Sequence, residues 1–433
     1  MILLSIILIF FVCLLIGVPV AFSIIIAAVI PLLFEPLISL TQASSIMIES
    51  FSSFTLLAIP LFIFCGALMN LTKVTDDLIY ISKALVGKLK GSLAHMNIVT
   101  SVFFGAISGS SVADVASLGR ILIPAMIKAG YSKEFAATIT AASSTIGSII
   151  PPSILLIVYG ALAQTSVAAL FIAGIVPGIL IGITQMVYAY MYAKKHDVGD
   201  IQNEQIGLPN DQTLSKTVAL KKSIFPVSLF LVVIVGIMSG IFTATEAASI
   251  AVVYVFIVAF FIKKERNFKK YMEVTRKAVI DSASIYILIA AAALLSWVLS
   301  YYKALDPIIN LLIENNFNPL MFLLLLMLLY VVLGTFMEPN SAMLIFVPLS
   351  VPIIQGLGID PVVAGIVTVM SIRLGTVTPP YGLSILLAAK VADTNVLRMM
   401  RQIIIFVCIY LVSIILIILF PHVVTFLPNI LME

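Results

Sequence analysis

Long apolar runs alternate with short polar stretches along almost the whole chain. Most runs approach the roughly 20 residues that a helix needs to cross a bilayer, and they exceed the ~10-residue alternating segments of a membrane β-barrel. The pattern therefore predicts an all-α, polytopic membrane protein with roughly a dozen crossings or half-crossings. We interpret the first run as a retained span, because it lacks a basic start and continues through Gly17 into a second run.

Composition also indicates that a bilayer is the solvent. Hydrophobic residues make up 62% of the 433 positions and charged residues only 10%, which is too few for a water-soluble surface. Cys13, Cys65 and Cys408 lie inside apolar runs without CxxC spacing, so we interpret them as buried small hydrophobes. They predict neither a disulfide framework nor a metal site.

The basic residues orient the chain. No Lys or Arg occurs before Lys73, and later ones gather between apolar runs. Because basic loops stay in the cytoplasm, we expect these clusters inside and both termini on the periplasmic side. The segment between Lys90 and Lys128 starts and ends inside but is too short for two spans, so it should be a re-entrant hairpin. The clusters lie at 73–90, 128–133, 194–222, 263–277 and 390–401.

The two halves share glycines and prolines at a fixed spacing. Gly147 and Gly375 are 228 positions apart (375 − 147), and so are the pairs Pro151-Pro152 and Pro379-Pro380. Such residues mark backbone events, so chance agreement explains them poorly. Since the elements recur with opposite sidedness, we predict two inverted-topology repeats, each with one re-entrant hairpin and one broken helix.

Polar, helix-breaking stretches interrupt the apolar sequence at 105–111, 147–153, 334–341 and 375–382. Tandem prolines remove amide donors and restrict the preceding residue, so both GxxxPP stretches should break helices inside the membrane, where only protein or a water-filled cavity can cover them. Free carbonyls and hydroxyls suit a cation such as sodium, whereas half-helix N-termini suit an anion. A single such residue is usually only a kink, but four paired breaks predict a binding site.

Four charged residues fall in segments assigned to the bilayer, where charges are costly and usually functional. Arg373 either clamps a substrate carboxylate through its planar fork or forms a structural ion pair with Glu338 or Asp114. Asp114 and Glu338 either neutralise a cation or cap a half-helix. Arg120 is expected to extend toward the cytoplasmic face.

At its breaks the sequence resembles the large permease subunit of tripartite ATP-independent periplasmic (TRAP) transporters, and the resemblance covers essentially the whole chain. It is carried by SGSSVADVASLGR at 108–120, IPAMIKAGY at 123–131, GSIIPPSILLIVYG at 147–160, GTFMEPNSAMLIFVP at 334–348, GIDP at 358–361 and GTVTPPYGL at 375–383.

The resemblance implies a sodium-driven importer of an organic acid, such as sialic acid or a C4-dicarboxylate, in the bacterial inner membrane. A transport domain would move against fixed scaffold helices as an elevator. The implied partners are a periplasmic substrate-binding protein and a small four-helix membrane subunit. We expect the small subunit as a separate chain, because no extra segment precedes Met1 or fills the central linker.

The resemblance also divides the chain. Scaffold helices are expected at 1–72 and 223–302, a cytoplasmic amphipathic arm at 73–90, a periplasmic arm at 303–317 and a cytoplasmic linker at 194–222. One transport-domain half spans 91–165, with hairpin 91–128 and broken helix 133–160; the other spans 318–390, with hairpin 320–354 and broken helix 361–389. Closing helices are expected at 166–193 and, with the tail, at 391–433.

Site residues carried over from the family form three groups. One sodium region would contain Ser108, Ser110, Ser111, Gly147, Pro151 and Pro152. The second would contain Gly334, Thr335, Gly375, Thr376, Thr378 and Pro379. Candidate substrate-binding residues are Arg373, Ser148, Asn340 and Ser341. The family often has Pro where this chain has Ser148, which leaves the local ligand geometry open.

Other classes of function fit less well. A stand-alone sodium-coupled carboxylate carrier would have a similar architecture but need no binding protein. An intramembrane enzyme would require an Asp pair, a Ser/His dyad or a HExxH helix, and an ATP-driven pump would require a phosphate-binding loop. The sequence contains none of these motifs, so we expect no enzymatic activity.

Overall fold

The computed structural model describes residues 2–35, 39–72, 74–87, 89–109, 111–198 and 216–432, with the backbone alone for 74–76, 106–108 and 216–223. Within these ranges every regular element is a helix, which confirms the predicted all-α class. Seven of these helices are long and apolar enough to cross a membrane. They are Phe54–Leu71, Val167–His196, Ala244–Ile262, Phe268–Tyr301, Pro319–Phe336, Pro339–Gly356 and Val396–Leu419.

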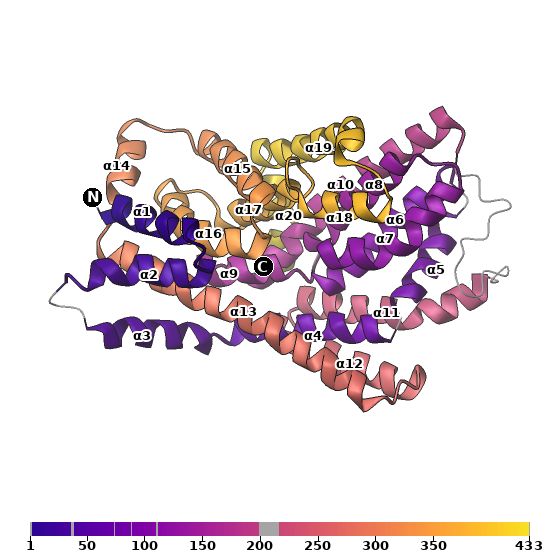
Figure 1. Ribbon diagram of the computed structural model, residues 1–433, viewed down its shortest axis with the longest axis horizontal. Helices are drawn as coiled ribbons and strands as arrows, with labels where there is room; N and C mark the ends of the chain where they lie inside the picture. The colour runs from indigo at the N-terminus through magenta and orange to yellow at the C-terminus, as the bar shows by residue number, and fades with distance from the viewer. Residues whose placement is uncertain are drawn as a thin grey trace.

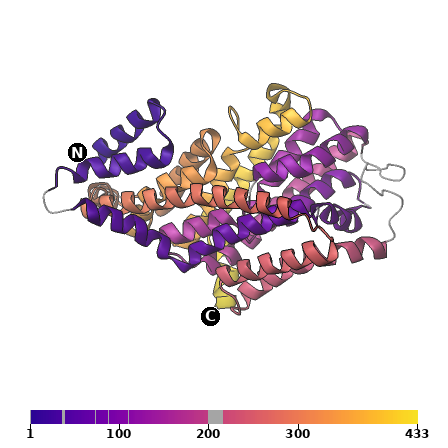
Figure 2. The same cartoon turned by 60° about the horizontal axis from the view of Figure 1, so that its bottom comes forward.

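A first group, here called the outer helices, comes from the start of each half. It comprises α1 (Ile2–Leu15), α2 (Val20–Leu32), α3 (Leu40–Glu49), α4 (Ala58–Leu71), α11 (Lys216–Met238), α12 (Ala244–Ile257) and α13 (Phe268–Tyr301). The long α13 packs on α2, α3 and α4 and runs along much of the length of the molecule (Figures 1 and 2). The turn from α1 to α2 contains Gly17 at φ +85°, a left-handed conformation that favours glycine.

The inner helices form two hairpins and two broken helices. Hairpin 1 is α6 (Ser92–Ser108) with α7 (Ser111–Lys128), and broken helix 1 is α8 (Lys133–Ser144) with α9 (Ile154–Ala163). Hairpin 2 is α15 (Pro319–Phe336) with α16 (Pro339–Gly356), and broken helix 2 is α17 (Pro361–Gly375) with α18 (Leu383–Val391). Each hairpin packs on the broken helix of its own half. Two further helices, α10 (Val167–His196) and α19 (Val396–Leu419), pack beside them.

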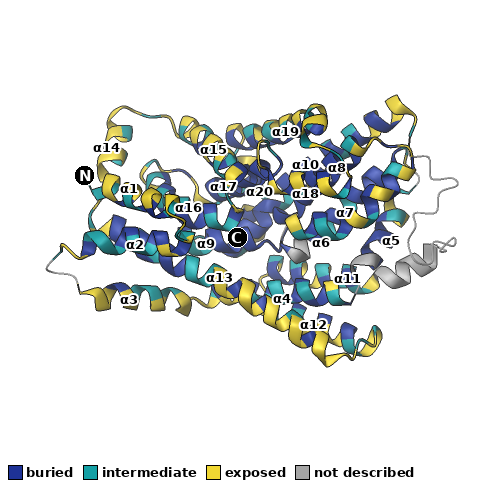
Figure 3. Ribbon diagram, viewed as in Figure 1, coloured by how far each residue is buried: buried dark blue, intermediate teal, exposed yellow. Residues whose placement is uncertain are grey.

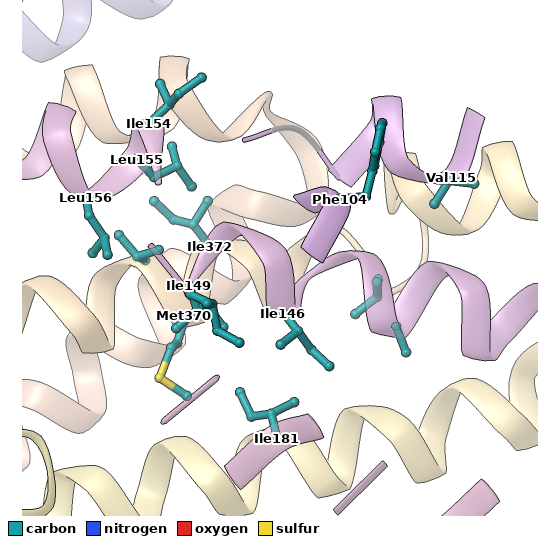
Figure 4. Close-up of a cluster of buried hydrophobic side chains, with 14 of the residues drawn as sticks. Phe104, Val115, Ile146, Ile149, Ile154, Leu155, Leu156, Ile181, Met370 and Ile372 are labelled. Carbon is teal, nitrogen blue, oxygen red and sulfur yellow. The ribbon is translucent and has the colours of Figure 1, made fainter. Parts of the chain in front are cut away.

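The buried core lies where the inner helices meet. Ile149 and Leu155 from the first half and Met370 and Ile372 from the second are each fully buried in it (Figure 4). By contrast, exposed large apolar side chains lie along α12, α13 and α19, as the yellow patches of Figure 3 show. An apolar exterior around a packed interior is the arrangement expected of a chain dissolved in lipid.

Two connecting helices bridge the groups, α5 (Val74–Val86) and α14 (Asp306–Glu314). The buried Asp77 of α5 forms an ion pair with Lys263, which follows α12, so α5 is tied to an outer helix. Most of the predicted linker, 199–215, lies outside the described residues.

Two helices differ from the sequence-based expectation. α13 begins at Phe268, inside the basic cluster 263–277 that was expected between apolar runs, because a helix that continues into water carries polar residues that hydropathy does not detect. The tail, for which the sequence predicted no separate helix, forms α20 (His422–Met432), which packs on α10.

Candidate functional site

The tip of each hairpin is a sharp interruption between two helices. In hairpin 1, α6 ends at Ser108, Gly109 takes a left-handed φ of +62°, and α7 begins at Ser111. In hairpin 2, Glu338 caps α16, because its Oε2 accepts a hydrogen bond from the Ser341 amide at 2.9 Å and its Oε1 accepts one from Asn340 Nδ2 at 2.7 Å. Glu338 therefore caps a half-helix, one of the two roles expected from sequence.

Both broken helices are interrupted at the predicted proline pairs, which are Pro151-Pro152 and Pro379-Pro380. In the first, a short 3-10 turn at Ile146–Ser148 follows α8, and the Ser153 hydroxyl caps α9 by accepting from the Leu156 amide at 3.4 Å. In the second, residues 376–382 separate α17 from α18. These helices end and restart inside the protein and leave main-chain groups without helical partners.

Paired glycines let each hairpin approach its broken helix at backbone distance. A Cβ added to Gly105 would lie 2.5 Å from the Cα of Gly147, and a Cβ added to Gly375 would lie 2.5 Å from the carbonyl carbon of Gly334. No real Cβ tolerates such contacts, so glycine is required on both sides. The two sequence halves thus use corresponding glycines, 105 with 147 and 334 with 375, at corresponding contacts.

Arg373 links the two halves at the breaks. It lies in the last turn of α17, is 4% exposed, and reaches the tip of hairpin 1. Its Nη1 donates to the Ser111 hydroxyl at 3.0 Å and its Nη2 to the Gly109 carbonyl at 3.1 Å, whereas its Nε has no hydrogen-bond partner within the described residues. Neither Glu338 nor Asp114 forms an ion pair with it. The proposed structural ion pair is therefore absent.

One residue of the first predicted sodium group contacts two of the predicted substrate residues. The hydroxyls of Ser111 and Ser148 lie 3.2 Å apart, so Arg373, Ser111 and Ser148 form one connected chain. Thr376 and Thr378 each donate their hydroxyl hydrogen to a carbonyl of the turn before them, at 2.7 Å in both cases. Their oxygen lone pairs therefore stay available to a cation. Thr335 donates in the same way to the Val331 carbonyl at 2.8 Å.

A cavity of about 950 Å³ lies beside these breaks. The inner helices contribute Gly109, Glu338, Pro339, Asn340, Ser341, Arg373 and Thr376 to its wall. The outer helices α4 and α13 supply the opposite wall, with Asn70, Lys277, Asp281 and Ser284. A cationic guanidinium, hydroxyls and an amide in one enclosure can bind an anion with polar substituents.

Some predicted residues lie elsewhere. Ser110 and the Ser108 side chain are outside the described residues. Asp114 is fully buried and faces away from the cavity, whereas Arg120 is exposed, consistent with its expected extension to a surface. The remaining predicted sodium residues do not line the cavity wall, so they could contribute to an ion site only through main-chain carbonyls. They are Gly147, Pro151, Pro152, Gly334, Gly375 and Pro379.

The outer-helix wall of the cavity was missed by sequence reasoning. Asp281 carried a usable signal, since it is a charged residue after the basic cluster 263–277, within the expected scaffold helices 223–302, and should have joined the other intramembrane charges. Asn70 carried none, because the end of an apolar run is an ordinary place for a polar residue.

Helical hairpins and broken helices arranged around a cavity are typical of secondary membrane transporters. Residues 7–423 match the family model of the DctM component of tripartite ATP-independent periplasmic transporters. The chain is 33% identical over 377 residues to the sialic acid TRAP transporter large permease protein of Vibrio cholerae, covering 87% of each chain. It is 35% identical over 398 residues to the C4-dicarboxylate TRAP transporter large permease protein of Pseudomonas aeruginosa, covering 92% of this chain and 91% of that one.

Among solved structures, the fold is similar to that of the Alcanivorax borkumensis YdaH transporter, with a TM-score of 0.62, 15% identity and 88% coverage of each chain. At that identity the similarity concerns the fold alone. The chain belongs to the DctM family of TRAP transporters. It is thus a multi-pass permease component of a bacterial transporter and not an enzyme, as the sequence predicted.

Proposed function

We propose that this chain is the permease subunit of a sodium-coupled, binding-protein-dependent transporter that imports an organic acid across the inner membrane. The observation that carries the proposal is Arg373, a buried guanidinium at the wall of a cavity between the breaks, whose Nε has no hydrogen-bond partner among the described residues. A carboxylate can accept from Nε and one Nη, which is the bidentate geometry that arginine favours.

Sodium coupling is supported by the oxygen atoms around the breaks. Thr376 and Thr378 keep their lone pairs free, and Ser111 and Ser148 add two more hydroxyls beside Arg373. Hard oxygen ligands of this kind suit an alkali cation. A cation bound there also offsets the charge of the entering acid, so the two ligands favour each other's binding.

An elevator motion is supported by the division of the cavity walls between the inner helices and the outer helices. Each hairpin is locked to its broken helix through glycine contacts, whereas the opposite wall of the cavity belongs to α4 and α13. The inner helices can therefore move together against the outer ones. From α13 the cavity is lined by residues between Val274 and Leu288, and this helix starts in the basic segment 263–277. That segment is predicted to lie on the cytoplasmic side, so the position of the cavity favours an inward-facing state.

Two partners complete the proposal, a small four-helix membrane subunit and a periplasmic binding protein that delivers sialic acid, a C4-dicarboxylate or a similar carboxylate. That the small subunit is a separate chain stays a prediction. The competing function, a stand-alone carrier, differs only in needing no binding protein.

Reconstitution separates the two functions. The chain is placed in proteoliposomes with its small subunit, and uptake of labelled sialic acid and succinate is followed with an inward sodium gradient, with and without the binding protein encoded beside it. We expect uptake only with both the gradient and the binding protein. Uptake by this chain without the binding protein would support the stand-alone carrier, and uptake indifferent to sodium would refute the coupling.

A further inference from the structure

Hairpin 1 contains a carboxylate that the proposed site does not use. Asp114 lies in the first turn of α7 and is 0% exposed. Within the described part of the chain, neither of its carboxylate oxygens has a hydrogen-bond partner, and no basic side chain forms an ion pair with it. It does not face the cavity, which is lined from α7 by Val112, Ala113 and Ala116.

A network of buried polar side chains from α6 and α8 reaches this carboxylate through Ser101. The Ser101 hydroxyl lies beside it. Ser101 and Ser143 hydroxyls are 3.0 Å apart, Ser143 donates to Asn97 Oδ1 at 3.2 Å, and Asn97 Nδ2 donates to the Thr140 hydroxyl at 2.5 Å. All four residues are 0% exposed. This cluster, Asn97, Ser101, Thr140 and Ser143, is separate from the chain of hydroxyls that Arg373 contacts.

A bare carboxylate in this environment would be very unfavourable. An ionised group without a partner loses its hydration on burial and is normally neutralised, paired or bound to a metal ion. Among the described residues, Ser101 provides a hydroxyl oxygen beside Asp114 and no basic side chain forms an ion pair with it. A cation from outside the chain would supply the missing positive charge.

We propose that Asp114 binds a monovalent cation, either a proton or a sodium ion, which crosses the membrane with the substrate. The inference rests on the proposed function and adds a second coupling site to it. In each cycle the carboxylate takes up one cation while the site faces the periplasm and releases it while the site faces the cytoplasm. One positive charge beyond those bound at the breaks then accompanies each substrate molecule.

The test measures charge per substrate. The assembled transporter is reconstituted, and the membrane potential that stops net uptake is determined with a sodium gradient alone and with a pH gradient alone. Asp114→Asn keeps the side-chain size but removes the negative charge. We expect this variant to carry one elementary charge fewer per substrate than the unaltered protein. A weaker dependence on the sodium gradient than in the unaltered protein identifies sodium as the ion, and loss of the response to the pH gradient identifies a proton.

Two controls make the result specific. Thr100→Val removes another buried hydroxyl of α6, which donates to Ser82 at 2.8 Å, and should leave the charge ratio unchanged. The other ionisable groups on helices packed against α7 are His95 of α6, Lys133 and Glu134 of α8, and Lys390 of α18. Because His95 is the buried one among them, His95→Gln should retain any pH response that depends on Asp114.

An unchanged charge ratio in Asp114→Asn overturns the inference, because Asp114 is then a permanently neutral structural acid. Should that variant not transport, binding is measured on purified protein through the dependence of the unfolding midpoint on sodium concentration and on pH. The unaltered protein should be stabilised more steeply by one of these cations than Asp114→Asn; equal slopes contradict the inference. Absence of sodium-dependent uptake in the unaltered complex instead refutes the proposed function itself.

Discussion

Replacing Gly375 by alanine should loosen hairpin 2 from broken helix 2. The added Cβ would lie 2.5 Å from both the carbonyl carbon of Gly334 and the carbonyl oxygen of Val331. Optimal carbon contacts are about 3.5–4.0 Å, so the overlap is roughly 1 Å. It involves backbone, which cannot rotate away as a side chain can. Overpacking of this kind costs about 1–3 kcal/mol, and the better helix propensity of alanine offsets at most about 1 kcal/mol.

The assay is the unfolding midpoint of purified protein in detergent. Gly182→Ala provides the matched control, since Gly182 lies in α10 and its new Cβ would be 4.0 Å from the nearest atom, Ile146 Cδ1. We expect Gly375→Ala to lower the midpoint and Gly182→Ala to leave it unchanged or raise it slightly. A midpoint for Gly375→Ala at or above that of the unaltered protein would refute the claim that these glycines hold the hairpin in place.

Two further predictions concern the ion site and the connecting helix. Thr378→Val removes an oxygen but keeps the shape, and should raise the sodium concentration for half-maximal uptake about tenfold, as expected for a lost ligand worth about 1.4 kcal/mol. Thr138→Val is the control, because Thr138 makes the same bond to a helix carbonyl, Glu134 at 2.7 Å, away from the breaks; equal effects in both variants would argue against a sodium ligand. Lys263→Ala removes the ion-pair partner of the buried Asp77 and should destabilise the protein by about 1–3 kcal/mol, since a buried carboxylate loses a hydrogen-bonded counter-charge. Lys270→Ala breaks an exposed pair with Glu265 at 2.8 Å and should change stability by less than about 1 kcal/mol in thermal unfolding; similar losses would contradict the special role of the Asp77 pair.

The helix interruptions could be predicted from sequence because their causes are local. Tandem proline removes amide donors whatever surrounds it, so Pro151-Pro152 and Pro379-Pro380 mark breaks without knowledge of the fold. Sequence spacing also indicated which glycines correspond in the two halves. It did not indicate that Gly105 meets Gly147, because that contact depends on how a hairpin packs against another helix.

The partners of charged residues could not be predicted in the same way. Arg373 contacts Gly109 and Ser111, more than 260 positions away, whereas the sequence predicted either a substrate carboxylate or an ion pair with Glu338 or Asp114. Glu338 is occupied by its own helix start, which is a local interaction, and Asp114 lies beside Ser101 of α6. Only the tertiary packing decides which of several intramembrane charges meet. The cavity wall formed by α4 and α13 was missed for the same reason.

The central claim is that the cavity at the four breaks binds the transported anion through Arg373. It is tested most directly by sodium-dependent uptake in reconstituted complexes carrying Arg373→Ala, with Arg120→Ala as the control, because Arg120 is an exposed arginine of hairpin 1 outside the cavity wall. Assembly of each complex is checked by size-exclusion chromatography. The account predicts that Arg373→Ala assembles but has lost uptake, whereas Arg120→Ala retains it. Normal uptake by Arg373→Ala would contradict the account and leave Arg373 a purely structural link between the two halves.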